Sequence, residues 1–130
     1  MAIVVVQVGT TVIEGVGVPI MARIRHPTTS DYLTQSATTS VIRKIFHSGT
    51  QVGSDVELTV ADVIFDSLQT ASDNAFWTLD ETGFNFNDVV DDDVFVDGDK
   101  NYVAWYHIEP TTGPKIKFPA RILTIEDPGD

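Results

Sequence analysis

The choice of apolar residues is the feature that most constrains how this chain can fold. The sequence contains 17 valines and 11 isoleucines but only 5 leucines, together with 15 threonines and 12 aromatic residues. Side chains that branch at Cβ lose rotamer freedom in a helix but pack well on a pleated sheet. With 130 residues, 42% of them hydrophobic, the chain can build one core. We therefore expect a single, mainly β domain.

Alternating apolar and polar residues locate several expected strands. Residues 18–25 are apolar at every second position, with arginines on the other face. Residues 41–47 have strand composition and end at a serine-glycine turn. Residues 102–109 are apolar on both faces, which is typical of a central strand, and the turn at 110–114 leads into residues 115–125. These last two segments are expected to pair as a hairpin.

A second hairpin is expected between two aromatic segments. Residues 76–79 and residues 83–87 are separated by a polar turn, and each has the length of a short strand. In the second segment, period-two alternation places Phe84 and Phe86 on one face of the strand. The Thr- and Ser-rich stretch from residue 27 to residue 40 is too polar for a core and is expected to be a loop.

The segment from residue 59 to residue 69 changes from a strand-like period to a helical one. Thr59 followed by Asp62 resembles a capping box at a helix start. A strand through residues 63–65 is the alternative, because the surrounding composition is β-rich. The fold class that we expect is an antiparallel β-sandwich with at most one short helix, at about residues 60–69. The helical stripe consists of apolar residues at i, i+3, i+4 and i+7, namely Ala61, Ile64, Phe65 and Leu68.

The N-terminal residues 1–17 form a Val-rich arm or edge strand before a sandwich domain at residues 18–130. An uncharged, β-prone segment invites unwanted pairing if its edge is left free. It must therefore pair within the chain or add as a strand to a neighbouring subunit. The residues expected to make subunit contacts are Ile3, Val4, Val5, Val6 and Trp105.

Charge excludes several classes of partner. The net charge of −11 argues against binding to nucleic acid or to an anionic membrane surface. Residues 50–110 hold fourteen acids against one base, Lys100, so the charge is segregated along the chain. This polarity suits contact between an acidic face and a basic edge in a homo-oligomer, and a solvated acidic surface is the alternative. We expect neither a signal peptide nor a membrane span.

No motif for chemistry stands out. The chain has no cysteine and no G-x-S-x-G elbow, and its three histidines are not at metal-ligand spacings, so we expect no enzyme activity, no catalytic residue and no cofactor. The weak candidates for a metal are calcium ligands in an acidic run that does not match the EF-hand loop. An exposed acidic turn is the alternative. The calcium candidates are Asp91, Asp93, Asp97 and Asp99.

Two aromatic features could serve binding. Trp105 could belong to the core, to a protein interface or to a sugar-binding platform. The row that begins with Tyr102 and continues through Ala104 and Tyr106 resembles the tyrosine corner of immunoglobulin-like sandwiches.

From Leu58 onward the order of elements resembles that of small structural proteins of tailed-bacteriophage virions. The resemblance rests on residues 61–70, Trp77, residues 83–86 and residues 102–108, and covers about half of the chain. It implies an immunoglobulin-like sandwich present in many copies on a capsid, neck, tail or baseplate, made in the host cytoplasm and contacting itself and other virion proteins. Two other function classes stay open, a carbohydrate-binding or adhesion module and a small hydrolase.

Overall fold

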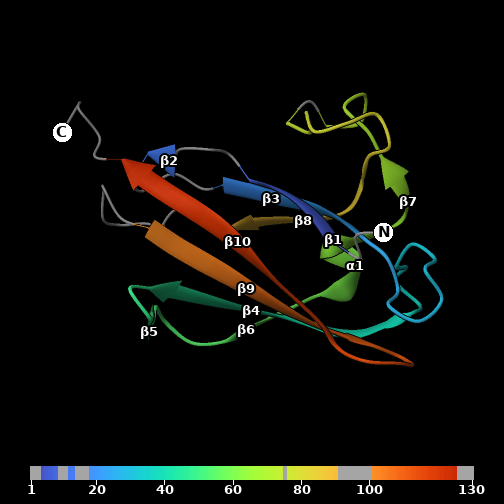
Figure 1. Ribbon diagram of the computed structural model, residues 1–130, viewed down its shortest axis with the longest axis horizontal. Helices are drawn as coiled ribbons and strands as arrows, with labels where there is room; N and C mark the ends of the chain where they lie inside the picture. The colour runs from blue at the N-terminus through green and yellow to red at the C-terminus, as the bar shows by residue number, and fades with distance from the viewer. Residues whose placement is uncertain (1–3, 9–11, 14–17, 75, 91–100, 126–130) are drawn as a thin grey trace.

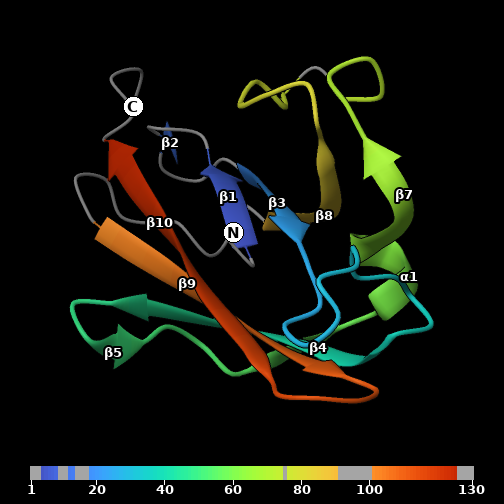
Figure 2. The same ribbon diagram turned by 45° about the vertical axis from the view of Figure 1, so that its right-hand side comes forward.

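The computed structural model describes residues 4–8, 12–13, 18–74, 76–90 and 101–125. Within them the chain forms two sheets and one short helix (Figure 1). The two sheets lie face to face (Figure 2), which confirms the expected antiparallel β-sandwich. The elements are β1 (Val4–Val8), β2 (Val12–Ile13), β3 (Val18–Ile24), β4 (Thr38–His47), β5 (Thr50–Gln51), β6 (Val56–Leu58), α1 (Val60–Val63), β7 (Ile64–Gln69), β8 (Phe84–Val90), β9 (Asn101–Pro110) and β10 (Ile116–Ile125).

The strand order is that of an immunoglobulin-like sandwich. One sheet has the order β1-β3-β8-β7, and the other has the order β2-β10-β9-β4-β5, with β6 also pairing with β4. The strands β1-β3-β8-β7 and β10-β9-β4-β5 follow the orders A-B-E-D and G-F-C-C′ of immunoglobulin domains, and β2 adds beside β10. The N-terminal segment is divided between the sheets, because β1 pairs antiparallel with β3 whereas β2 pairs parallel with β10. The expected hairpin of β9 and β10 is also confirmed.

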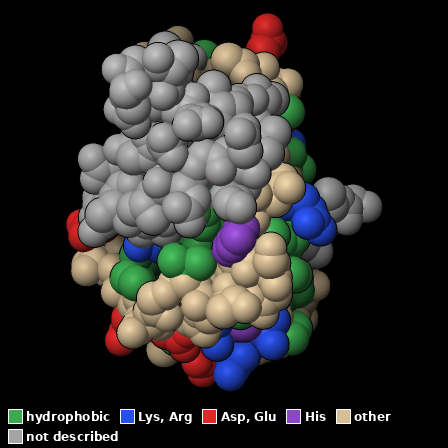
Figure 3. Space-filling view, turned by 90° about the vertical axis from the view of Figure 1, so that its left-hand side faces the viewer, with side chains coloured by type: hydrophobic (Ala, Val, Ile, Leu, Met, Phe, Trp, Pro, Cys, Tyr) green, Lys and Arg blue, Asp and Glu red, His purple; other side chains and the backbone are tan. Residues whose placement is uncertain are grey.

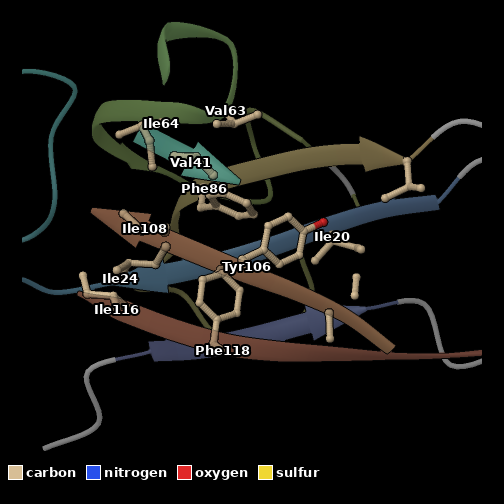
Figure 4. Close-up of a cluster of buried hydrophobic side chains, with 14 of the residues drawn as sticks. Ile20, Ile24, Val41, Val63, Ile64, Phe86, Tyr106, Ile108, Ile116 and Phe118 are labelled. Atoms are coloured by element: carbon tan, nitrogen blue, oxygen red, sulfur yellow. The ribbon is translucent and has the colours of Figure 1, made fainter. Parts of the chain in front are cut away.

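The core lies between the sheets and is built around three aromatic rings (Figure 4). Tyr106 of β9 stacks on Phe118 of β10 with 5.2 Å between ring centroids. Phe86 of β8 meets both rings edge-on, at 5.0 Å and 5.6 Å. Edge-to-face and offset-stacked pairs are the preferred aromatic geometries. Buried aliphatic residues, such as Ile20 and Ile108, surround these rings.

The N-terminal segment is an edge strand of this domain. Val4, Val6 and Val8 pair with Ile24, Ala22 and Ile20 of β3. All three valines pack against the main core cluster. For the described residues of β1 the structure shows pairing within the chain, and the expected subunit contacts of Val4, Val5 and Val6 stay a prediction.

Deleting residues 1–9 is expected to lower the stability of the monomer. Three partly buried valines leave the core, which costs about 2 kcal/mol of unfolding free energy when a fully buried valine contributes about 1.5 kcal/mol. Chemical denaturation followed by circular dichroism would measure the loss. A deletion variant as stable as the full chain would show that β1 contributes nothing to the core.

The expected helix is present but short. It covers only Val60–Val63, and Thr59 is its N-cap residue without a side-chain cap hydrogen bond. The capping box is therefore absent, and a helix reaching residue 69 was wrong. From Ile64 the chain runs as β7, which pairs with β8, because Ile64 then buries its side chain in the sandwich core.

The predicted hairpin of residues 76–79 with residues 83–87 was wrong. Residues 76–79 belong to the β7–β8 connection, and Trp77 from this connection packs with Met21 and Phe84 in a second apolar cluster. Phe84 and Phe86 consequently belong to different clusters. The side chain of Asn85 explains the change of face, because its amide accepts from the backbone N–H of Ile24 at 2.7 Å and donates to the carbonyls of Ile24 and Leu33.

Candidate functional site

The outward-facing side of the six-stranded sheet is the candidate site. Along β9 the residues Tyr102, Ala104, Tyr106 and Ile108 are buried, so the residues between them point away from the core. Cross-strand partners share a face, which identifies the neighbours of these residues on β4, β6 and β10. We call this surface the outer face; it comprises Ile42, Lys44, Phe46, Glu57, Val103, Trp105, His107, Lys117, Pro119 and Arg121.

Trp105 occupies the middle of the outer face. Its cross-strand partners are Lys44 on β4 and Pro119 on β10, and its side chain is only partly buried. Trp77, in contrast, is completely buried, and its indole N–H donates to the carbonyl of Asp80 at 2.9 Å. The structure places Trp105 outside the core. Of the three roles considered for this residue, a protein interface and a ligand platform therefore remain.

A shallow recess of about 220 Å³ opens on this face beside the Trp105 row. Its lining comes from residues of β4, β9 and β10, together with Lys115 before β10 and Asp55 before β6. Ile42 supplies apolar surface there. The charged and titratable lining consists of Lys44, Asp55, His107, Glu109, Lys115 and Lys117.

The pKa values of two titratable groups in the recess are shifted. A hydrogen bond from Gln51 to Asp55, at 2.6 Å, is the main cause that lowers the pKa of this carboxyl, and Lys44 at 3.5 Å assists. The pKa of His107 is also lowered, first by partial burial and then by the charges of Lys44 and Lys117. His107 is therefore neutral at pH 7, and a proton would be added to it only in more acidic solution.

Three cations gather on the β10 side of the outer face. Arg23 and Arg43 pair with Asp80 and Asp88 elsewhere in the molecule. Within the described residues, the cations of β10 and the residue before it take part in no ion pair. These cations are Lys115, Lys117 and Arg121. Figure 3 shows basic and acidic side chains side by side along the lower edge of the molecule.

A buried charged cluster connects the two sheets. Arg43 Nη1 of β4 donates to Asp88 Oδ2 of β8 at 2.8 Å, and the hydroxyl of Tyr106 donates to the same oxygen at 2.7 Å. Arg43 is 9% exposed and Asp88 is 4% exposed. Burial and the Asp88 charge raise the pKa of Tyr106 well above its ordinary value, so the hydroxyl keeps the proton that it donates. The closed surroundings give this cluster a structural role.

Sequence reasoning missed this cluster, although one signal was available. Arg43 lies between Val41 and Ile45 on the inward phase of its strand, and Asp88 lies between Phe86 and Val90 in the same way. A charged residue on an apolar phase predicts a buried ion pair when a second such residue has the opposite charge.

The other predicted site residues are dispersed. Val4, Val5 and Val6 lie in β1, on the sheet opposite the outer face, so they are not brought together with Trp105. Ile3 and the calcium candidates Asp91, Asp93, Asp97 and Asp99 fall outside the described residues, so their predictions stay untested. Within the described ranges, no group of three or more His, Asp or Glu side chains is arranged to hold a metal ion.

Comparison with protein-family models, with curated proteins and with solved structures finds no match to this chain. Among the residues that the structure describes, no helix combines the length and the apolar character needed to cross a membrane. The arrangement of the site, an aromatic side chain and a charged recess on a sheet face, is suited to binding a surface or a polar group.

Proposed function

We propose that this chain is a non-enzymatic structural protein that assembles in multiple copies through the outer face. The observation that carries the proposal is the partly exposed Trp105, flanked by Lys44 and Pro119 in the middle of a sheet face. Interfaces concentrate their binding energy in a few central aromatic and cationic residues. The partly buried Phe46 and Val103 in the next row extend the apolar part of this face.

The place of assembly that we propose is the virion of a tailed bacteriophage, where the partners are further copies of this chain and other virion proteins. This part of the proposal is supported by the sequence resemblance over residues 61–70, 83–86 and 102–108. Mass spectrometry of purified phage particles tests it directly. Absence of the chain from particles whose genome encodes it would refute a virion role.

Replacing Trp105 with serine is expected to convert the assembled protein into monomer. The substitution removes the largest apolar side chain of the outer face, and truncation of such central aromatics commonly costs about 2 kcal/mol or more of binding free energy. Size-exclusion chromatography with light scattering would measure the mass, and circular dichroism would confirm that the β-sheet is retained.

Phe76→Ser is the matched control, because Phe76 is 67% exposed and lies on the connection near the other sheet. This variant should keep the mass of the unmodified protein. Loss of assembly in both variants, or in neither, would contradict a contact centred on Trp105.

The alternative is a carbohydrate-binding or adhesion module, and the recess beside Trp105 is the observation that favours it. Trp77 is fully buried, so a change in tryptophan emission on adding a glycan would report Trp105. A saturable emission change with a glycan panel, lost in Trp105→Ser, would support this function in place of assembly.

A further inference from the structure

The charges on the outer face are divided across its width. Ile42 pairs with Glu57 of β6 on one side and with His107 of β9 on the other, and His107 pairs with Lys117 of β10. Across the sheet from β6 to β10, this row therefore consists of an acid, an aliphatic residue, a histidine and a base. The acid and the base are about 14 Å apart, since neighbouring strands are spaced by about 4.8 Å.

The same division holds in the neighbouring rows. On the β6 side lies Asp55, whereas the β10 side carries Lys115 and Arg121. Glu57 and Lys117 are both exposed, and neither forms an ion pair within the described part of the chain. The middle strands β4 and β9 contribute apolar and aromatic side chains around Trp105, and also the charged or titratable Lys44, His107 and Glu109. Such a face has a negative edge, a mixed centre built around Trp105 and a positive edge.

We infer that the outer face is a two-fold dimer interface in which a second copy of this chain packs with its symmetry axis parallel to the strands. This inference rests on the proposed function and names its partner and its geometry. Rotation about such an axis exchanges the two edges, so β10 of each copy lies over β6 of the other. Lys117 then faces Glu57 of the second copy, and the contact occurs twice.

Charge selects this arrangement over the other two-fold packing. An axis across the strands would place β10 over β10 and bring Lys115, Lys117 and Arg121 against their own copies. Like charges that meet across an interface are unfavourable, whereas complementary edges attract. With the axis along the strands, the central apolar residues also meet, because β4 of one copy lies over β9 of the other. Trp105 then faces Lys44 of the second copy, which is a favourable cation–π arrangement.

The available area is sufficient for such a dimer. Strands β4, β9 and β10 are each ten residues long. The fourth strand, β6, adds three residues. At about 3.4 Å per residue and about 4.8 Å between strands, this surface spans about 540 Å². Two such surfaces bury about 1,080 Å², which exceeds the area of about 1,000 Å² that a specific protein interface needs.

Two single charge reversals test the inference. Glu57→Lys should place lysine against Lys117 of the second copy, and Lys117→Glu should place glutamate against Glu57. Each reversal acts twice in a symmetric dimer, so we expect the dissociation constant to rise about tenfold or more in low salt. Sedimentation velocity over a concentration series would measure it. Asp62→Lys makes the same charge change on exposed α1, outside the outer face, and should have no effect.

A mixture of the two charge-reversal variants provides a second test of the inference. An equimolar mixture of Glu57→Lys and Lys117→Glu should dimerise again, because each copy then offers both lysines or both glutamates to the other. The double variant Glu57→Lys/Lys117→Glu should also dimerise, since its edges are exchanged but still complementary. Recovery in the mixture would show that neither variant was misfolded.

The possible failures are distinguishable. A chain that stays monomeric at every concentration and salt overturns assembly in multiple copies, and the two-fold contact with it. A chain that assembles but does not respond to either reversal, or does not recover on mixing, overturns the two-fold arrangement alone.

Discussion

Replacing Asp88 with alanine is expected to lower the free energy of unfolding by about 3–5 kcal/mol. The substitution leaves Arg43 buried between the sheets without a counter-charge, and Tyr106 loses the acceptor of its hydroxyl. Arg43 Nε already has no hydrogen-bond partner, so the substitution adds a second unsatisfied group to the same buried guanidinium. Urea denaturation of the purified variant would measure the change.

Asp80→Ala provides the control for this effect. Asp80 also accepts from an arginine, Arg23, at 2.9 Å, but its side chain is partly exposed to water. Exposed pairs contribute about 0–1 kcal/mol, so the two aspartate variants should differ severalfold in their cost. If both variants lost the same free energy of unfolding, the burial of Asp88 would add nothing to its contribution.

An apolar replacement of the whole cluster separates the cost of a broken pair from the value of the intact pair. The combined variant Arg43→Met, Asp88→Leu and Tyr106→Phe removes every charged or hydroxyl group of the cluster. Buried ion pairs replaced as a unit by apolar residues commonly leave stability unchanged or raise it by about 1–4 kcal/mol. A large loss in this variant would indicate that the ion pair itself stabilises the fold.

Trp77→Ala is the second substitution with a large expected effect, about 3–5 kcal/mol. Trp77 is fully buried, and its ring lies 5.3 Å from that of Phe84. It holds the β7–β8 connection on the outward side of the four-stranded sheet, where Met21 completes the cluster. Its removal leaves a cavity and frees the indole's hydrogen-bond acceptor, the carbonyl of Asp80. Thermal unfolding would report the loss.

Phe76→Ala tests whether the effect belongs to the Trp77 position and not to the connection in general. Phe76 is the preceding residue and is mostly exposed, so its truncation should change stability by less than about 0.5 kcal/mol. The backbone that follows Trp77 stays attached through Gln7, whose side-chain oxygen accepts from the N–H groups of Thr78 and Leu79. Similar losses in both variants would show that the connection unfolds as a unit without a dominant anchor.

Local pattern was sufficient to predict the fold class and several strands. Period-two alternation identified β3, and the two-faced pattern of residues 102–109 identified β9 as a central strand, because both properties depend only on neighbours in the sequence. The helical stripe at residues 61–68 was misleading. Its Ile64 and Phe65 are strand residues that pack against β8 and the Trp77 cluster. Packing against residues distant in sequence decided this structure, and the local period carries no information about it.

The candidate site was predictable only in part. Trp105 was identified from the sequence, but its exposure depends on which phase of β9 faces the second sheet. The row from Glu57 to Lys117 joins residues sixty positions apart and depends on the pairing of four strands. The Asn85 side chain that substitutes for backbone pairing beside Ile24 has no local signature either.

The buried cluster of Arg43, Asp88 and Tyr106 also bears on how the chain folds in time. Its members come from three strands that lie 45 and 18 residues apart in sequence, so its formation requires long loops to close first. We expect contacts of this kind to form late in folding, and the loss of a late contact mainly speeds unfolding. Asp88→Ala should therefore shorten the lifetime of the folded sandwich and leave the rate of its formation almost unchanged.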